Sequence, residues 1–501
     1  MNVMKKMAVV GVSCALLCAY AQAEEGRAAT GPDFESVCHD RVTAVADGIC
    51  SVTKVYMADD SDTVCIDFVL TPEAESDIRC RIELPPPERW DGRLWGVGNG
   101  GFAGIIPNIS LYRRMNTAAV TTDLGTHDAV AKVKNERKWP LAVQRDYQWR
   151  GTHLMTVYAK QLVEACYGKP PSHTYFNGGS CGGRQGFSEA IRFPGDYDGI
   201  VAHVPSNNTL ANRLGKWLVW RQTHDDKGKC LFTKDEMRAA ADAAVEYFAT
   251  KDPKPYAGRY LADGRVSPSD LDGILALAAK NKPSLQEGDK LARLKGLHTP
   301  FRGDGECLAL GFTPGAYLGD RMAYVPPEKT WREILEFAVK DGPWWNANGV
   351  DLSRFFKRGG KLIMTVGWED QTLSPLVMVE HYERLCARMG GLENAMRHCR
   401  MFCAPGAAHG GGTGRATQGE LGPVSARKAL IEWVEKGIPP DRIMVLDRPL
   451  KKYFPVTTYP GLLVDDGRGG WKRVERPRSK IQMSDRLFAC DPAPKAPEDE
   501  D

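Results

Sequence analysis

The residues most able to do chemistry lie in a glycine-rich nonapeptide, residues 178–186. Its sequence is Gly-Gly-Ser-Cys-Gly-Gly-Arg-Gln-Gly, between a strand-like run at residues 173–176 and a helix-like run that starts near Gly186. Glycines around a nucleophile permit a strained strand-to-helix turn that lifts the side chain off a sheet. The helix N-terminus behind the turn stabilises developing negative charge. The stretch therefore indicates nucleophilic catalysis.

Two overlapping Gly-x-nucleophile-x-Gly patterns occur in this stretch. Residues 178–182 match it with Ser180 as the nucleophile, and residues 179–183 match it with Cys181. A chain with 51 glycines in 501 residues also produces such a pattern by chance. The choice between the two nucleophiles therefore depends on their partners elsewhere in the chain.

An acid and a histidine follow later strand-like runs, in the order that the triad of an α/β-hydrolase requires. Asp370 follows the run at residues 361–366, and His409 follows the run at residues 400–403. In this arrangement His409 takes the hydroxyl proton of Ser180, and Asp370 fixes the imidazole tautomer and stabilises the imidazolium.

Each partner also has a purely structural alternative. Asp370 precedes Pro375 and an apolar helical run, where it would cap the helix, and Glu369 is a second acid beside it. His409 lies among glycines and would be an exposed loop histidine. Chain order, strand context and spacing together favour the triad over these alternatives.

Two main-chain N–H groups are expected to form an oxyanion hole. One belongs to Cys181, the residue after the nucleophile, and the other to the loop at Gly100 and Gly101. That loop lacks side-chain bulk where a substrate carbonyl must approach. The surrounding stretch, residues 98–104, is no nucleotide fingerprint, because no acidic partner and βαβ unit follow at the required spacing.

Strand-like and helix-like runs alternate on both sides of the nonapeptide, which predicts a parallel sheet with crossover helices and an α/β-hydrolase fold. The expected strands are residues 93–98, 118–123, 173–176, 197–202, 361–366 and 400–403, and the expected helices are residues 151–167, 376–389 and 423–436. Between them, residues 208–350 are mostly helical and contain Trp217, Trp220, Trp331, Trp344 and Trp345.

The N-terminus is typical of a secretory signal. Lys5 and Lys6 precede an apolar run, residues 7–20, which is followed by the small-x-small sequence of residues 21–23. The run is too short for a membrane anchor, so we expect a secreted or periplasmic protein. The expected parts are a signal peptide (1–23), a Cys-rich N-terminal extension (24–85), a catalytic domain (86–207 and 351–490), a lid or substrate-specificity domain (208–350) and an acidic tail (491–501).

The cysteine count and the charge limit the function further. Of 14 cysteines, two lie in the signal sequence, and the remaining dozen are expected to form disulfides after export. No paired Cys-x-x-Cys and no His-Glu-x-x-His occurs, so no metal is expected. A net charge of +3 without a basic stripe excludes nucleic acid as the expected partner.

At these residues the chain resembles the tannase and feruloyl esterase family, a group of secreted α/β-hydrolases that also includes polyester-monomer hydrolases. The resemblance covers nearly the whole mature chain, and its strongest blocks are residues 94–104, 175–205, 351–375, 400–412 and 433–437. The resemblance implies Ser180 as nucleophile, Asp370 as acid and His409 as base.

Two departures from the family pattern stand out. The family usually places cysteines immediately before the nucleophile and immediately after the catalytic histidine, joined by a disulfide, whereas this chain has Gly179 and Gly410. We therefore expect packing and backbone hydrogen bonds in the loop at residues 410–414 to hold His409. Many relatives also carry a calcium loop in the insertion. Here the pairs at residues 263–264 and 272–273 lack the surrounding ligands, so neither calcium nor another cofactor is expected.

The resemblance implies a serine carboxylic ester hydrolase that forms an acyl-enzyme with hydroxycinnamic or gallic acids. The expected partner is a small aromatic ester or a phenolic ester of plant polysaccharide, and the Trp-rich insertion is compatible with an aromatic pocket. Alternatives are an esterase for aromatic polyester monomers, a non-catalytic protein that binds phenolics or glycans, and a disulfide-rich structural protein.

Overall fold

The structure is a computed structural model that describes residues 31–59, 61–132, 138–252, 259–298, 346–370, 372–409, 426–447 and 451–475. The expected signal peptide and acidic tail lie outside these residues, as do Trp331, Trp344, Trp345 and the loop that begins at Gly410.

Within the described residues, nine strands form one sheet in the order β1-β2-β3-β5-β4-β6-β7-β8-β9. The strands are β1 (Cys50–Met57), β2 (Val64–Leu70), β3 (Ile78–Leu84), β4 (Arg93–Val97), β5 (Ala118–Thr122), β6 (His173–Gly179), β7 (Gly199–His203), β8 (Lys361–Gly367) and β9 (Cys399–Ala404). The first three pair antiparallel, β3 pairs antiparallel with β5, and all later neighbours are parallel. The predicted parallel sheet is confirmed for β4 to β9.

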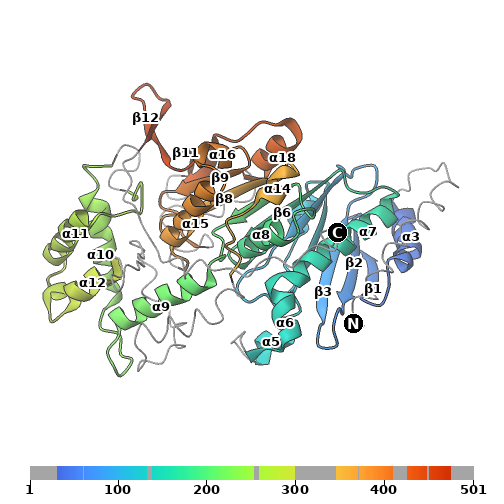
Figure 1. The fold of residues 1–501 in the computed structure, drawn as a ribbon, viewed down its shortest axis with the longest axis horizontal. Helices are drawn as coiled ribbons and strands as arrows, with labels where there is room; N and C mark the ends of the chain where they lie inside the picture. Colours follow the sequence, from blue (N-terminus) through green and yellow to red (C-terminus); the bar gives the residue numbers. More distant parts are fainter. Residues whose placement is uncertain are drawn as a thin grey trace.

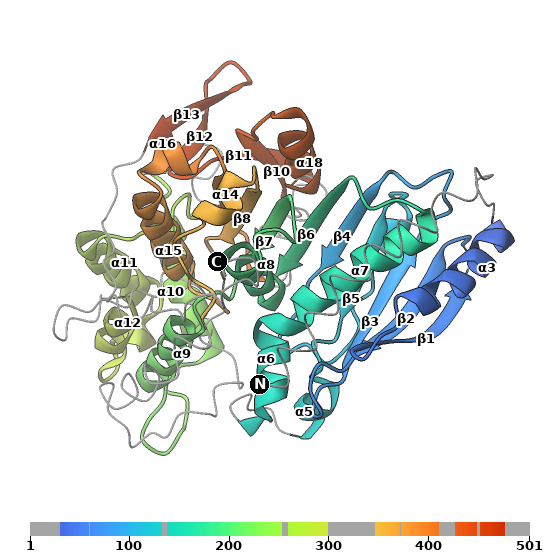
Figure 2. The same cartoon turned by 45° about the vertical axis from the view of Figure 1, so that its right-hand side comes forward.

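Helices cover both faces of the sheet because neighbouring strand residues point to opposite sides. In β6, Phe176 packs with the core beneath α8 (Cys181–Arg192) and α15 (Pro375–Arg388), whereas Tyr175 packs with the core beneath α18 (Arg427–Lys436). Further along the sheet, α7 (Gly151–Tyr167) covers the same face as α8 (Figure 2). The remaining short helices of this part are α4 (Ser110–Arg113), α5 (His127–Lys132), α6 (Leu141–Arg145), α14 (Ser353–Lys357) and α16 (Leu392–Ala395).

The insertion is helical and has its own apolar core. Its helices are α9 (Thr209–Thr223), α10 (Lys234–Tyr247), α11 (Pro268–Asn281) and α12 (Lys290–His298), and they lie at one end of the sheet (Figure 1). Fully buried side chains such as Ile274, Leu285 and Leu294 form a separate cluster there. The predicted helical character of this insertion is therefore confirmed for the described residues.

The Cys-rich N-terminal region extends the sheet instead of forming a separate layer. Helix α3 (Gly31–Arg41) packs beside α7, and β1, β2 and β3 continue the sheet at the end opposite the helices of the insertion (Figure 1). Among the described cysteines, Cys38, Cys50 and Cys80 are not joined in a disulfide, and disulfide formation after export stays a prediction. None of the described helices combines the length and the apolar character that a membrane crossing needs.

In the described residues, two hairpins follow α18. Strand β10 (Arg442–Asp447) pairs with β11 (Lys452–Thr457), and β12 (Gly461–Asp465) pairs with β13 (Trp471–Glu475). Helix α7 matches its predicted limits, whereas β7 begins at Gly199 and the described part of α18 begins at Arg427, both later than predicted.

The prediction of a helix start near Gly186 is wrong, because α8 begins at Cys181. Glycine has a low helix propensity, so the glycines of the nonapeptide gave no indication of a helix in the sequence of the first turn. Packing requires them there. A Cβ at Gly183 would lie 2.6 Å from the Cα of Pro205, and one at Gly186 would lie 2.8 Å from Ile200.

Candidate active site

Ser180 occupies the sharp turn between β6 and α8. Its backbone has φ 57° and ψ −114°, a conformation that L-residues rarely adopt. Main-chain hydrogen bonds hold this strained residue: its N–H donates to the carbonyl of His203 (2.9 Å), and its carbonyl accepts from the N–H groups of Arg184 (3.1 Å) and Ser206 (2.9 Å). The strained strand-to-helix turn that the sequence predicts is thus present at Ser180, and the role of Ser180 as nucleophile stays a prediction.

Close backbone crossings explain why glycine surrounds Ser180. A Cβ at Gly178 would lie 2.6 Å from the carbonyl carbon of Gly182, and one at Gly98 would lie 2.6 Å from the Cα of Gly182. Strand β6, helix α8 and the loop after β4 therefore approach one another more closely than any larger residue permits.

Asp370 and His409 lie in contact after neighbouring parallel strands. Asp370 follows β8, His409 follows β9, and His409 Nδ1 lies 2.8 Å from Asp370 Oδ2. The N–H groups of Thr372 and Leu373 each donate to Asp370 Oδ1 at 2.8 Å. The carboxylate, which is 1% exposed, is therefore oriented toward the imidazole.

The structural alternatives for these two residues do not match the geometry. Helix α15 begins at Pro375, and Asp370 bonds N–H groups that precede it rather than those of its first turn. His409 is bonded to Asp370, with 17% of its side chain exposed. Since β6, β7, β8 and β9 are consecutive and parallel, Ser180, Asp370 and His409 all follow carboxyl ends at one edge of the sheet. Their joint action as a triad stays a prediction.

The side chain of Cys181 points into a packed cluster. It is 2% exposed and packs with Leu124, Trp139 and Tyr147. The Arg184 Nη2 group donates to its sulfur at 3.3 Å. Cys181 is the first residue of α8, so its N–H has no acceptor within the helix. This geometry suits the predicted main-chain donor better than a nucleophile.

The loop after β4 is tied to α8 by hydrogen bonds. The carbonyl of Asn99 accepts from the N–H of Gly182 (2.7 Å), and the N–H of Asn99 donates to Gln185 Oε1 (2.8 Å). A Cβ added at Gly100 or Gly101 would have no described atom within 4 Å. The predicted glycine loop therefore lies beside the turn with open space around it, and its role as a donor stays a prediction.

Sequence reasoning missed the side chains that fasten this loop. Gln185 links it to α8, and the Tyr147 hydroxyl donates to the carbonyl of Gly101 at 3.2 Å. The one available signal for Gln185 was a neutral polar residue in the expected helix after the turn. Tyr147 lies more than thirty positions before Gln185 and well after the loop in the sequence, and no local pattern indicated its contact with the loop.

His203, at the end of β7, is a half-buried neutral histidine beside the turn. Its Nδ1 lies 2.9 Å from Thr365 Oγ1 and its Nε2 lies 3.1 Å from Asn177 Oδ1. Burial, helped by the charge of Arg427, lowers its pKa from 6.5 to about 4. The unfolded chain therefore binds more protons than the folded one between these two values.

Stability is accordingly expected to fall as the pH is lowered from 6.5 to about 4. His203 contributes roughly 3 kcal/mol to this loss, at about 1.4 kcal/mol for each pKa unit. Denaturant unfolding of the His203→Gln variant should show a flatter pH dependence than wild type over this window. The exposed His39→Gln variant is the control and should keep the wild-type slope. Equal slopes for His203→Gln and wild type would contradict the assignment.

The acidic residues that were considered for calcium have other partners. Asp263 accepts hydrogen bonds from the Arg265 guanidinium at 2.9 and 3.0 Å, and Lys295 donates to Asp272 at 2.6 Å. Each carboxylate is thus paired with a cationic side chain of the insertion.

Comparison with known proteins gives a consistent result. The sequence profile described as "Tannase and feruloyl esterase" matches residues 64–254 and 332–474, more than half of the chain. The "Probable feruloyl esterase B-2" of Aspergillus flavus is 28% identical over 416 residues, which are 72% of this chain and 76% of that protein. The "Probable feruloyl esterase" of Arthroderma benhamiae is 25% identical over 406 residues, which are 72% of this chain and 74% of that protein.

Solved structures show the same fold. The crystal structure of feruloyl esterase B from Aspergillus oryzae has a TM-score of 0.72 at 18% identity, covering 88% of this chain and all of that one. The tannin acyl hydrolase from Aspergillus niger has a TM-score of 0.66 at 15% identity, and the match covers 92% of this chain and 97% of that one. The α/β-hydrolase fold is thereby confirmed.

Proposed function

Because the chain belongs to the tannase and feruloyl esterase family of carboxylic ester hydrolases, we propose that it hydrolyses esters of hydroxycinnamic or gallic acids through a Ser180, His409 and Asp370 triad. The contact of 2.8 Å between His409 Nδ1 and Asp370 Oδ2 is the observation that carries the proposal. It supplies the oriented base that a serine nucleophile requires.

The first half-reaction forms the acyl-enzyme. Ser180 Oγ attacks the ester carbonyl carbon, and its proton passes to His409 Nε2, since Nδ1 faces Asp370. The resulting oxyanion accepts hydrogen bonds from the N–H of Cys181 and from the loop at Gly100 and Gly101. The intermediate then collapses, the bond to the alcohol oxygen breaks, and the imidazolium returns its proton to the departing alcohol.

The second half-reaction repeats these steps with water. His409 accepts a proton from a water molecule that attacks the acyl carbon, and the tetrahedral intermediate expels Ser180 Oγ. The proton returns to Ser180, and the free aromatic acid leaves. Overall, one ester and one water become one acid and one alcohol.

Two observations support the choice of Ser180 over Cys181. Ser180 alone has the strained backbone of the turn, and the sulfur of Cys181 is enclosed by Tyr147 and Arg184. The N-terminal sequence further supports the proposal that the enzyme acts outside the cytoplasm, on a small aromatic ester or on phenolic esters of plant polysaccharide.

Hydrolysis of four esters by the purified mature protein tests the proposal. We expect turnover of at least one of methyl ferulate, methyl caffeate and methyl gallate, with kcat/KM at least about tenfold above that for a short aliphatic p-nitrophenyl ester. Release of the acid is followed by chromatography. Turnover of the aliphatic ester alone would contradict the aromatic acyl group, and absence of turnover together with absence of fluorophosphonate labelling would favour a non-catalytic binding protein.

A further inference from the structure

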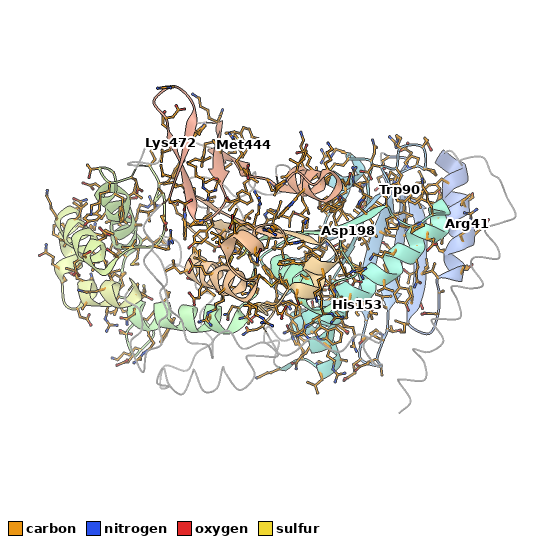
Figure 3. The ribbon with its side chains drawn as sticks, turned by 45° about the horizontal axis from the view of Figure 1, so that its top comes forward. Arg41, Trp90, His153, Asp198, Met444 and Lys472 are labelled. Carbon is orange, nitrogen blue, oxygen red and sulfur yellow. The ribbon has the colours of Figure 1, made fainter. Side chains whose placement is uncertain are left out.

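A second cluster of chemically active side chains lies behind the turn, at the far end of α8. It consists of His153 on α7, Glu189 on α8 and Asp196 in the connection from α8 to β7. One ligand atom of each residue lies within 4.8 Å of those of the other two, and no other such group of three occurs among the described residues. Figure 3 labels His153 on its helix.

Glu189 is the unusual member of this cluster. It is 1% exposed, and neither carboxylate oxygen accepts a hydrogen bond from a described N–H or O–H donor, while the neighbouring Asp196 carboxylate lies close enough to interact with it. Burying a carboxylate without partners is strongly unfavourable. Lys160 and Arg192 are close enough to act on Glu189 through their charge, but neither donates a hydrogen bond to it. Within the described residues, no cationic side chain or hydrogen-bond donor therefore binds these oxygens directly.

The other two members are held in place and lie nearer to solvent. His153 Nδ1 lies 2.7 Å from Asp196 Oδ2, and the imidazole stacks on Phe193 with ring centroids 3.7 Å apart. The N–H of Asp196 donates to the carbonyl of Phe193 at 3.0 Å. The side chains of His153 and Asp196 are 25% and 12% exposed, so these two residues lie at the solvent-facing side of the cluster.

We propose that His153, Glu189 and Asp196 bind one divalent transition-metal ion, with Zn²⁺ as the best fit. One imidazole and two carboxylates are a donor set that suits Zn²⁺. Bonds of about 2.1 Å separate the ligand atoms of a tetrahedral site by roughly 3.4 Å, within the spread of this cluster. Three protein ligands leave the fourth position to water.

The ion has a structural role, because it lies away from the proposed nucleophile. Glu189 follows Ser180 by nine residues, about 13 Å along the axis of α8. By joining α7, α8 and the connection to β7, the ion fastens the helix whose N-terminus supports Ser180. The inference is independent of the proposed esterase activity.

A shared proton is the competing explanation for the cluster. If Glu189 is protonated and donates to Asp196, the pair needs no metal, and a glutamine at position 189 replaces the carboxylic acid as a hydrogen-bond donor. The two explanations therefore predict opposite results for the Glu189→Gln variant.

Thermal unfolding of the chelator-treated, purified protein with and without ZnCl₂ tests the proposal, together with the zinc content of dialysed protein. We expect one zinc per chain and a Tm that rises by several degrees, since binding to the folded state alone stabilises it. The Glu189→Gln and His153→Gln variants should bind Zn²⁺ at least about tenfold more weakly. The Glu164→Gln variant, an exposed change of the same kind on α7, should behave as wild type.

Two results would overturn the proposal. One is a Tm of wild type that does not respond to ZnCl₂ while Glu189→Gln is as stable as wild type, which is the shared-proton result. The other is an equal response in wild type, Glu189→Gln and His153→Gln, which places the zinc elsewhere. Since no readout uses ester hydrolysis, either result leaves the proposed function untouched.

Discussion

The Ser180→Ala variant is expected to lose about a million-fold in kcat on the aromatic ester that wild type cleaves, and to remain folded. The change removes only Oγ, because the main-chain bonds from Ser180 to His203, Arg184 and Ser206 do not involve the side chain. Without Oγ no acyl-enzyme forms, and only residual catalysis from the oxyanion hole remains. The rate of product release under saturating ester measures the loss in kcat, and a thermal melt of the same variant shows whether it remains folded.

Two matched variants make this result specific. Ser172→Ala removes an exposed hydroxyl that donates to the carbonyl of Gly92 (2.9 Å), and it should retain wild-type turnover. Cys181→Ala keeps both Ser180 and the main-chain N–H at position 181, and a fluorophosphonate should still label Ser180. Turnover that survives Ser180→Ala, with labelling that disappears in Cys181→Ala, would instead identify Cys181 as the nucleophile.

The Asp370→Asn variant is expected to lower kcat by about 10,000-fold at neutral pH with little change in stability. The amide oxygen of asparagine can still accept from the N–H groups of Thr372 and Leu373, as Asp370 Oδ1 does at 2.8 Å. Its NH₂ group then faces His409 Nδ1 and donates to it. The imidazole is thereby held with its proton on Nε2, which cannot accept the proton of Ser180.

The kinetic signature of this variant lies in the chemical step. The acylation rate should fall, whereas KM, set by contacts outside the triad, should change far less. Glu369→Gln is the control, since it makes the same kind of change at the adjacent acid, whose N–H donates to the carbonyl of Ala407. A loss in Glu369→Gln that matches the loss in Asp370→Asn would show that the choice of acid is wrong.

Gly179 stands where the resemblance implies a cysteine before the nucleophile. A Cβ at this position would make an ordinary contact of 3.5 Å with His203. Gly410 and the loop at residues 410–414 lie outside the described residues, so the hypothesis that this loop holds His409 stays a prediction. Within the described residues, the hydrogen bond to Asp370 restrains His409.

The sequence by itself determined the local elements around the candidate site residues and predicted the order of these residues along the chain. The glycines around Ser180 indicated a turn, because only glycine permits the close approach of β6, α8 and the loop after β4. Strand-like runs before Asp370 and His409 predicted that both follow carboxyl ends of parallel strands, which the sheet order confirms. Each of these signals is local, since it depends on neighbours within a few residues.

Only the tertiary structure decided the contacts between distant segments. It showed that α8 begins at Cys181, that β1, β2 and β3 continue the sheet, and that Gln185 and Tyr147 fasten the loop at residues 99–101. It also brought Glu189 and Asp196 to His153, more than thirty residues earlier in the chain. Such contacts form because buried polar side chains and main-chain polar groups must be hydrogen-bonded, often to residues far away in the sequence. Local sequence patterns do not indicate which distant residues these are.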